Sequence, residues 1–134
     1  MKLSSKTITA IKMFVDLGEH YEEGFISLVD IAKRKDVSKK FLEQIVPLYK
    51  NNGLITGTRG NQGGYRLAKS PREIMLKDII FLSENYFLTE MVGYPPVDRI
   101  LSDMDDLMYG YLGSLQLSKL VEEETESYSN NYII

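Results

Sequence analysis

A glycine-rich stretch between two short apolar segments constrains the fold of this chain most strongly. Residues 52–67 place Arg59-Gly-Asn-Gln-Gly-Gly64 between Leu54-Ile-Thr and Tyr65-Arg-Leu67. Glycine adopts the backbone angles that tight loops need, and apolar residues bounded by such loops are typical of strands. The pattern predicts two short strands joined by a loop with a basic residue at each end, which is the form of the wing in a winged helix.

The residues before this hairpin predict two short helices with a tight turn between them. Ser27-Leu-Val-Asp30 has the form of a capping box, which opens a helix from about Leu28 to Lys35. Asp36-Val-Ser38 makes the turn, and Ser38 caps a third helix that ends near Asn52. The inward positions of this third helix are Phe41, Leu42, Ile45, Val46 and Tyr49. Helix, turn, helix and hairpin in this order predict a winged helix-turn-helix, the geometry of a DNA-reading module.

Further helices complete a mainly α fold with one small β-hairpin. A helical pattern from Ser5 to about His20, capped by Ser4 or Ser5, predicts a first helix that supports the core. Its apolar positions are Ile8, Ile11, Phe14, Val15 and Leu17. A fourth helix is expected from Leu76 to about Phe87, buried through Leu76, Ile79 and Ile80. Pro47 lies inside the third helix and removes a backbone hydrogen bond, so we expect a kink or early loosening there.

The last predicted helix follows a loop at Gly93-Tyr-Pro-Pro96 and carries apolar residues at alternating spacings of four and three. These residues are Val97, Leu101, Met104, Met108, Tyr111 and Leu115. This is a heptad spacing, and a seam of this length needs a partner helix, which indicates a homodimer. Gly110 and Gly113 either permit close approach of the partner helix or simply allow fraying.

The predicted elements divide the chain into three parts. A winged-helix domain covers residues 1–75, dimerisation helices with a connecting loop cover 76–121, and a tail covers 122–134. An apolar fraction of 43% argues against global disorder, and 134 residues suit one compact domain with an appendage. From Glu122 the sequence is polar and acidic, so we expect a flexible tail, which ends in the apolar residues Tyr132, Ile133 and Ile134.

Charge is distributed unevenly along the chain. Residues 1–77 carry 14 lysines and arginines against 8 acidic residues, whereas residues 78–134 carry 2 against 11. A basic half can neutralise phosphates and release their counterions, while an acidic half is repelled from a duplex. The alternative is that these charges are only solvated surface.

The start of the third helix carries side chains suited to reading base edges. Gln44 can pair with adenine, Glu43 can accept from the cytosine amino group, and the lysines can contact phosphate or guanine. At the hairpin, Arg59 favours the negative potential of the minor groove, and glycine permits close approach. The candidate residues for DNA contact are Ser27, Ser38, Lys39, Lys40, Phe41, Glu43, Gln44, Arg59, Gly60, Gly63, Gly64 and Tyr65. The alternative for the polar residues is that they are only solvated, since about half of such positions on any surface helix make no contact with DNA. Tyr65 either packs beneath the hairpin or contacts phosphate.

Enzymatic chemistry finds little support in the sequence. His20 is the only histidine, and we expect it to be a surface or half-buried side chain rather than a base or metal ligand. The carboxylates of residues 103–106 have the pattern of a solvated helix face. The chain has no cysteine, which excludes disulfides and thiolate nucleophiles, and we expect no cofactor and no bound metal. Because no apolar run approaches the length of a membrane span, we expect a cytoplasmic protein.

Several motifs occur in a characteristic order. They are Ser27-Leu-Val-Asp-Ile-Ala, Val37-Ser-Lys-Lys-Phe-Leu-Glu-Gln-Ile, Gly63-Gly-Tyr-Arg-Leu and Ile74-Met-Leu-Lys-Asp-Ile. Together they resemble the Rrf-two (BadM-like) family of bacterial transcription regulators, and the resemblance covers residues 1–120. It implies a homodimeric winged-helix repressor or activator, not an enzyme, whose two recognition helices enter successive major grooves of an imperfect palindrome.

Many members of that family hold an iron–sulfur cluster with three cysteines between the fourth and last helices. This chain has Gly93-Tyr-Pro-Pro96 in that region and no cysteine, so cluster sensing is excluded. The chain more closely resembles a cysteine-free branch, the cysteine-metabolism repressors of Gram-positive bacteria, which share the proline in the recognition helix and a tail ending in tyrosine-isoleucine. This resemblance implies control of sulfur or cysteine metabolism.

The same branch implies a protein partner, since its regulators form a complex with cysteine synthase. A flexible tether with an apolar tip and a free carboxylate suits a pocket built for a small amino-acid carboxylate, so Tyr132, Ile133 and Ile134 are candidate docking residues. The alternative is that these residues fold back onto the dimer. For the whole chain, the alternative to a repressor is a winged-helix interaction adaptor with little or no specific DNA binding. Replacing Lys39, Lys40 and Arg59 would discriminate between these two functions.

Overall fold

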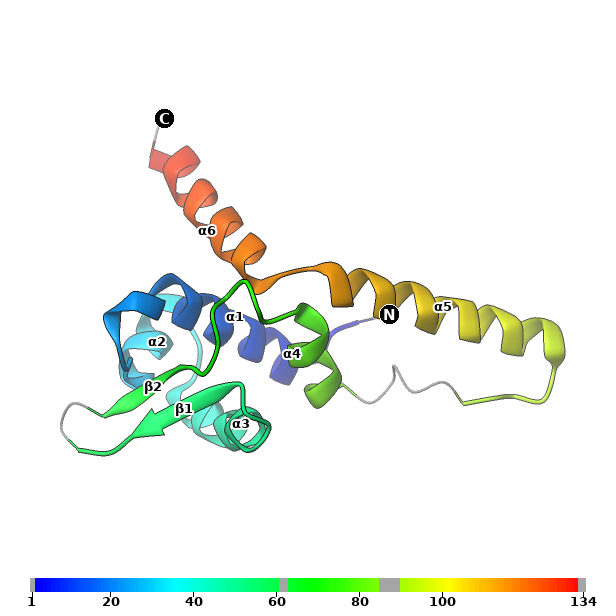
Figure 1. The fold of residues 1–134 in the computed structure, drawn as a ribbon, viewed down its shortest axis with the longest axis horizontal. Helices are drawn as coiled ribbons and strands as arrows, with labels where there is room; N and C mark the ends of the chain where they lie inside the picture. Colours follow the sequence, from blue (N-terminus) through cyan, green and yellow to red (C-terminus); the bar gives the residue numbers. More distant parts are fainter. Residues whose placement is uncertain (1, 61–62, 85–89, 133–134) are drawn as a thin grey trace.

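The computed structural model describes residues 2–60, 63–84 and 90–132. Along the chain the elements are α1 (Ser5–Glu19), the short 3-10 helix η1 (Tyr21–Glu23), α2 (Leu28–Lys35), α3 (Lys39–Asn51), β1 (Ile55–Thr58), β2 (Gly64–Leu67), α4 (Leu76–Ser83), α5 (Pro95–Ser114) and α6 (Leu117–Tyr132). Helices α1 to α4 and the hairpin form one body, from which α5 projects on the side away from the hairpin (Figure 1). This mainly helical fold with an antiparallel two-stranded sheet confirms the predicted fold class. None of the helices described is both long enough and apolar enough to cross a membrane.

Serine caps begin the first three helices as the sequence predicts. The hydroxyl groups of Ser4, Ser27 and Ser38 each accept a hydrogen bond of 3.2 Å from the backbone N–H three residues later. These bonds satisfy amides that have no partner inside the helix. Between α2 and α3, Asp36 adopts a φ of 53°, in the left-handed region, and so ends α2. The bounds of α2 and the start of α3 therefore confirm the predicted helix-turn-helix.

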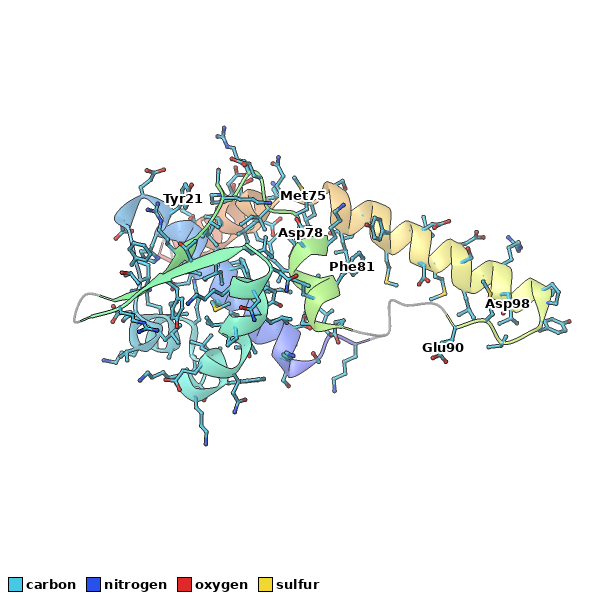
Figure 2. All side chains as sticks on the ribbon, turned by 60° about the horizontal axis from the view of Figure 1, so that its bottom comes forward. Tyr21, Met75, Asp78, Phe81, Glu90 and Asp98 are labelled. Atoms are coloured by element: carbon cyan, nitrogen blue, oxygen red, sulfur yellow. The ribbon has the colours of Figure 1, made fainter. Side chains whose placement is uncertain are left out.

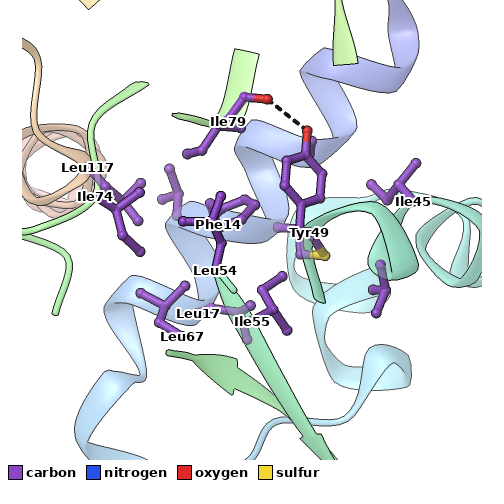
Figure 3. Packing of buried hydrophobic residues seen from close by; sticks show 14 of the residues in the cluster. Phe14, Leu17, Ile45, Tyr49, Leu54, Ile55, Leu67, Ile74, Ile79 and Leu117 are labelled. Atoms are coloured by element: carbon purple, nitrogen blue, oxygen red, sulfur yellow. Dashed lines mark hydrogen bonds between the residues drawn. The ribbon is translucent and has the colours of Figure 1, made fainter. Parts of the chain in front are cut away.

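The core lies where α1, α3, α4 and the hairpin meet (Figure 3). The ring of Tyr49 in α3 meets that of Phe14 in α1 edge to face, with centroids 4.9 Å apart. The Tyr49 hydroxyl donates a hydrogen bond of 2.9 Å to the carbonyl oxygen of Ile79 in α4. Burial disfavours the charged form of this phenol and raises the pKa of Tyr49. The proposed recognition helix is thus fixed to the rest of the body through the core.

The apolar stripe predicted for α1 has the right period, but its buried face is rotated. Ile8 is 44% exposed and Ile11 is only half-buried, although both were predicted to face the core. The buried residues of α1 are Thr7, Thr9, Ala10, Met13, Phe14, Val15, Asp16 and Leu17. Thr7 faces α4, where its hydroxyl lies 2.6 Å from that of Ser83. An apolar stripe cannot include Thr7, whose contact with α4 is polar, and the predicted stripe also left out Ala10 and Met13, which are fully buried.

Other helix bounds also differ from the prediction. Helix α3 continues through Pro47 to Asn51, so the expected early loosening is absent. Helix α4 ends at Ser83, and residues 85–87 at the end of the predicted helix lie outside the described residues. Pro95 and Pro96, which were assigned to a loop, form the first turn of α5. The fixed φ of proline and its missing N–H suit that position.

The expected flexible tail from Glu122 is wrong for residues 122–132, because this segment belongs to helix α6. The single long final helix of the prediction is two helices, since α5 ends at Ser114 and α6 begins at Leu117. Leu117 is fully buried, and its N–H donates a hydrogen bond of 2.8 Å to the Ile74 carbonyl. The start of α6 is therefore packed into the core, which a reading of its acidic composition does not reveal.

Candidate nucleic-acid interface

Helix α3 presents a polar face on the side opposite its buried residues. Its buried side chains are Leu42, Ile45, Val46 and Tyr49, while Lys39, Lys40, Glu43 and Gln44 are exposed. Phe41 is half-buried, so it supports the helix more than it faces solvent. The structure therefore brings the predicted base-reading residues together on one face at the start of α3.

An ion pair crosses this exposed face. Lys39 Nζ lies 3.5 Å from Glu43 Oε1, and the two side chains are 54% and 53% exposed. Exposed pairs of this kind stabilise a helix by only about 0.3–0.5 kcal/mol, so phosphate or a base edge can readily replace either partner. Ser38 is occupied as the N-cap of this helix, and its hydroxyl accepts from the Phe41 N–H.

The hairpin is held against the start of α2 by two backbone hydrogen bonds. The N–H of Ile26 donates to the Tyr65 carbonyl and the N–H of Tyr65 donates to the Ile26 carbonyl, both at 2.8 Å. Gly64 permits this approach, because a Cβ there would collide with the Ile26 carbonyl and lie 3.0 Å from the Ser27 nitrogen. Gly64 is buried at this contact, so the structure does not place it in the exposed loop to which it was assigned.

The loop side of the hairpin keeps the other predicted residues together. Arg59 and Gly60 are exposed immediately after β1, and Gly60 adopts a φ of 106°. The Gly63 N–H donates a hydrogen bond of 2.9 Å to the Gly60 carbonyl. A Cβ at Gly63 would lie 2.7 Å from the Thr58 carbonyl oxygen, so the loop closes tightly. Arg59 thus extends from a compact glycine loop, whose residues 61–62 lie outside the described part of the chain.

Two aromatic contacts distinguish the faces of the hairpin. Tyr65 is half-buried, and a Cβ at Gly57 would lie 2.9 Å from its ring, which indicates that Tyr65 packs across the hairpin. The guanidinium of Arg66 lies 5.5 Å from the ring centroid of Tyr21 and 5.7 Å from that of Phe25. Figure 2 labels Tyr21 on the side of the body that carries the hairpin, opposite α5. Arg66 is therefore engaged with aromatic rings at the base of the hairpin.

A buried ion pair that was not predicted from the sequence fixes α2 on α1. Arg34 near the end of α2 pairs with Asp16, which is fully buried in α1. The hydrogen bond to Asp16 raises the pKa of Arg34. A carboxylate between Val15 and Leu17 in a helix that faces the core was the available signal, because a buried charge needs a partner.

Helix α5 carries an apolar face that is exposed in a single copy of the chain. Its members are Val97 (40% exposed), Ile100 (50%), Met104 (40%), Leu107 (74%) and Tyr111 (63%). These residues, which we call the α5 seam, are spaced three and four apart, as in a heptad repeat. Figure 2 shows α5 clear of the body, with Asp98 towards its far end.

The α5 seam differs in part from the predicted dimerisation residues. Leu101 and Met108 are half-buried, and Ile100 and Leu107 take their places on the exposed face. Leu115 follows the end of α5 and packs against the core. The rotation of α5 is set by its contact with α4, where the ring of Tyr109 stacks on Phe81 with centroids 5.1 Å apart. Of the predicted docking residues, Tyr132 ends α6, and Ile133 and Ile134 lie outside the described residues.

Comparison with known proteins finds relatives along most of the chain. Residues 3–123 match the family Rrf2, described as iron-dependent transcriptional regulator. The HTH-type transcriptional regulator IscR of Photorhabdus laumondii is 34% identical over 133 residues, covering 92% of this chain and 81% of that protein. The structure of CymR, the global cysteine regulator of B. subtilis, matches with a TM-score of 0.83 at 29% identity, covering 92% of this chain and 98% of that chain. The structure of T. potens IscR matches with a TM-score of 0.81 at 30% identity, covering 95% and 90%.

The chain does not supply the ligands that an iron–sulfur cluster requires. Such clusters are held mainly by cysteine thiolates, and this chain has no cysteine. Within residues 2–60, 63–84 and 90–132, no three histidine, aspartate or glutamate side chains are grouped to hold a metal ion. The donor set therefore does not fit a cluster.

The comparisons and the fold agree on the class of protein. The similar proteins are transcriptional regulators rather than enzymes. The fold described above matches that of the solved regulators along more than nine tenths of this chain. This chain belongs to the Rrf2 (Rrf-two) family of winged-helix transcription regulators.

Proposed function

We propose that this chain represses transcription as a homodimer that binds a two-fold symmetric operator through α3 and the hairpin. The proposal rests on the difference between the two sides of α3, one buried and apolar and the other exposed and polar. Its inner side is buried, and its outer side presents Lys39, Lys40, Glu43 and Gln44 to solvent. A recognition helix needs this division, because one face must hold it rigidly while the other enters the major groove.

The exposed residues of α3 suit two different tasks. The amide of Gln44 can pair with adenine and the carboxylate of Glu43 can accept from cytosine, so these two side chains would specify sequence. Lys39 and Lys40 lie in the first turn and would contact phosphate or guanine. All four precede Pro47, so the proline ring lies beyond the reading part of the helix, and within that part only the carbonyl of Glu43, four residues earlier, loses its backbone donor.

The hairpin would add a second contact with the duplex. Arg59 is exposed beside Gly60, and an arginine on a compact loop can enter a narrow minor groove. The docking of Tyr65 on Ile26 fixes the hairpin to the helix-turn-helix, so α3 and Arg59 would meet the duplex as one unit.

The α5 seam supports the homodimer. A row of apolar side chains between 40% and 74% exposed favours burial against the same row of a second copy. A two-fold axis through such an interface would present two α3 helices to successive major grooves, roughly 34 Å apart. The operator would then be an imperfect palindrome.

The proposed regulon is sulfur or cysteine metabolism, and the proposed mode of action needs no iron–sulfur cluster. The absence of cysteine supports cluster-free action. Structural similarity to CymR, which is described as the global cysteine regulator of B. subtilis, supports the metabolic assignment. Staphylococcus aureus CymR is also similar, with 33% identity and a TM-score of 0.78 over 91% of this chain and 97% of that chain.

Cysteine synthase is the proposed protein partner, and Tyr132, Ile133 and Ile134 are the proposed docking residues. Three apolar residues after a polar, acidic segment suit an apolar pocket of a protein partner. Deleting these three residues should abolish binding to cysteine synthase in a titration. Unchanged affinity would eliminate this docking mode and favour the alternative, in which the three residues pack on the dimer.

The proposed DNA binding is tested by selecting bound sequences from random duplexes at two salt concentrations. We expect one two-fold symmetric site, bound with an affinity that falls steeply as salt rises. Replacing Lys39, Lys40 and Arg59 by alanine should weaken binding and reduce the salt slope by about one per lost phosphate contact. Lys119→Ala is the control for each of the three substitutions made singly, because it likewise removes one exposed positive charge, from α6.

The outcome of the selection separates the two functions. A symmetric site that only the triple variant loses supports the repressor, and its sequence identifies candidate target genes. Weak binding without sequence preference, affected equally by Lys119→Ala and the other substitutions, would favour the interaction adaptor. Repeating the selection with cysteine synthase present then shows whether the partner changes operator affinity.

A further inference from the structure

Lys35 occupies a sensitive position in the helix-turn-helix. It is the last residue of α2 and precedes Ser38, the N-cap of α3, by three residues. The connection is short and ordered, because Asp36 is in the left-handed conformation and the Val37 N–H donates to the Ala32 carbonyl at 3.1 Å. Movement of Lys35 would therefore be transmitted directly to the first turn of α3.

The ammonium group of Lys35 is held by two carboxylates from different helices. Its Nζ lies 2.6 Å from Glu19 Oε1 in α1 and 3.0 Å from Glu124 Oε1 in α6. Only 8% of the Lys35 side chain is exposed, and a charge this buried requires its partners. Burial lowers the pKa of Lys35, but the hydrogen bonds to Glu19 and Glu124 outweigh it and leave the pKa above its usual value. The cluster links α1, α2 and α6 at one point.

Helix α6 is seated at this point by a close contact with α1. A Cβ at Gly18 would lie 2.7 Å from Val121 Cγ2, so the glycine permits the helices to approach. Glu19 follows Gly18, and Glu124 lies three residues beyond Val121, which is just under one helical turn. The same helix contact therefore brings both carboxylates to Lys35.

The end of α2 has a second attachment that does not use α6. Arg34 binds Asp16 of α1 through two hydrogen bonds. If α6 moved away, Lys35 would lose Glu124 and keep only Glu19 as a partner. Helix α2 would remain attached to α1 through Arg34. The expected result is a change in the position of the turn and of α3 without unfolding of the body.

We propose that Lys35 is a positioning residue that couples the docking of α6 to the orientation of α3, so that a molecule displacing α6 lowers operator affinity. This inference rests on the proposed function, because it concerns regulation of the same DNA-binding face. A displacing molecule shifts the equilibrium only by its preference for the undocked state, so it must occupy the face of α6 that carries Val121 and Glu124 and that packs on α1 and Lys35 when α6 is docked. The ion pair between Glu124 and Lys35 is the link that transmits it.

The test compares Glu124→Gln with Glu126→Gln. Both remove one negative charge from α6, so any general electrostatic gain in DNA binding is the same, but Glu126 is exposed and Glu124 pairs with Lys35. Relative to Glu126→Gln, Glu124→Gln should lower the ratio of operator affinity to random-duplex affinity by about three- to tenfold. The salt slope should be equal in the two variants, since no phosphate contact is removed.

Hydrogen exchange without DNA gives an independent readout. The amides of Val37 and Phe41, which donate to the Ala32 carbonyl and the Ser38 hydroxyl, should exchange faster in Glu124→Gln than in Glu126→Gln. If the wild type selects no operator, the proposed function fails. The comparison of hydrogen exchange between Glu124→Gln and Glu126→Gln still tests whether the docking of α6 is coupled to α3. Equal exchange and equal affinity ratios in the two variants would overturn the coupling alone.

A double-mutant cycle assigns the effect to Lys35. In a Lys35→Met background, which keeps the apolar stem, Glu124→Gln should have little further effect on exchange or on the affinity ratio. An undiminished effect of Glu124→Gln in that background would show that α6 acts by another route and would overturn the assignment to Lys35. If Glu124→Gln fails to fold, Glu124→Asp is compared with Glu126→Asp, since both keep the charge and shorten the side chain, and only the first withdraws the carboxylate from Lys35.

Discussion

Arg34 of α2 binds Asp16 of α1 through two parallel hydrogen bonds, Nε to Oδ2 at 2.8 Å and Nη2 to Oδ1 at 2.9 Å. The carboxylate is fully buried, whereas the arginine side chain is 38% exposed. The guanidinium therefore reaches from the surface to neutralise a charge inside the body. This paired geometry sets both the distance and the rotation of α2 on α1, because a planar fork fits a carboxylate in one orientation.

We expect Arg34→Met to lower the free energy of unfolding by about 2–3 kcal/mol, because it leaves the Asp16 carboxylate buried without its partner. The expected loss of unfolding free energy is smaller than for breaking a fully buried ion pair, because Arg34 is partly solvated. Urea denaturation measures the change. Arg99→Met is the control: the Arg99–Asp103 pair is exposed on both sides, and its loss should change stability by less than about 0.5 kcal/mol. Equal effects of the two substitutions would contradict this role of Arg34.

Gly64→Ala should destabilise the protein by about 1–3 kcal/mol, because its Cβ would collide with the Ile26 backbone. The amides of Ile26 and Tyr65 should lose protection from hydrogen exchange, since each donates across this contact. Gly110→Ala is the comparison, because a Cβ there meets nothing within 4 Å and alanine favours a helix by about 0.5–1 kcal/mol. Unchanged exchange in Gly64→Ala would show that the hairpin does not depend on this close approach.

Leu107→Ser should weaken the proposed dimer by at least about tenfold, because two symmetric copies of a leucine would lose burial at about 1.5–3 kcal/mol each. Leu107 is 74% exposed in a single copy, so the substitution should leave the fold of each protomer intact. Asp106→Ser introduces the same residue at the neighbouring exposed position and should leave the dimer unchanged. Sedimentation equilibrium measures both. Equal dissociation constants would rule out the α5 seam as the interface.

Stability should depend on the charge of Lys35 at high pH. The folded-state pKa lies above the usual value near 10.5, so the stabilisation is fully present below pH 10.5 and is lost as the pH rises through the folded pKa. The difference in unfolding free energy between the wild type and Lys35→Met should therefore be constant from neutral pH up to about pH 10.5 and shrink above it. Urea titrations of both proteins across this range measure it. A difference that persists unchanged at the highest pH would show that the ammonium charge is not its source.

Gln44→Ala should relax operator specificity at one base pair and cost about 1–3 kcal/mol in operator affinity. The amide is exposed on the outer side of α3 and its loss leaves the buried side of the helix untouched. Lys40→Ala should instead weaken binding to all sequences alike, because a phosphate contact carries no base information. Competition binding against operators with single substitutions distinguishes these outcomes. Equal loss on every sequence for Gln44→Ala would remove it from the base-reading set.

Local features of the fold were predictable because short-range chemistry determines them. Ser27 and Ser38 cap the helices that begin at the next residue, and the left-handed conformation of Asp36 ends α2. Strands β1 and β2 pair Ile55 with Leu67 and Thr58 with Gly64, as a glycine loop between two short strands indicates. The exposed residues of α3 follow from its period, because the buried positions lie one helical turn apart.

The features that the sequence analysis missed depend on contacts between distant parts of the chain. The rotation of α5 follows from the stacking of Tyr109 on Phe81, and so the exposed face includes Ile100 and Leu107 instead of Leu101 and Met108. An acidic composition indicated a flexible tail, whereas the packing of Leu117 and the pairing of Glu124 with Lys35 belong to a docked helix. Neither contact has a signature in the local sequence.

Residues close together in the sequence were enough to predict the first three helices with their serine caps, the hairpin and the polar face of α3, because each depends on a short stretch of the chain. The tertiary structure alone decided that Gly64 is a packing residue, that Asp16 holds Arg34, and that α6 reaches the helix-turn-helix through Lys35. These relationships join residues far apart in the chain. They exist only once burial has raised the energetic cost of leaving a charge or a backbone group without its partner.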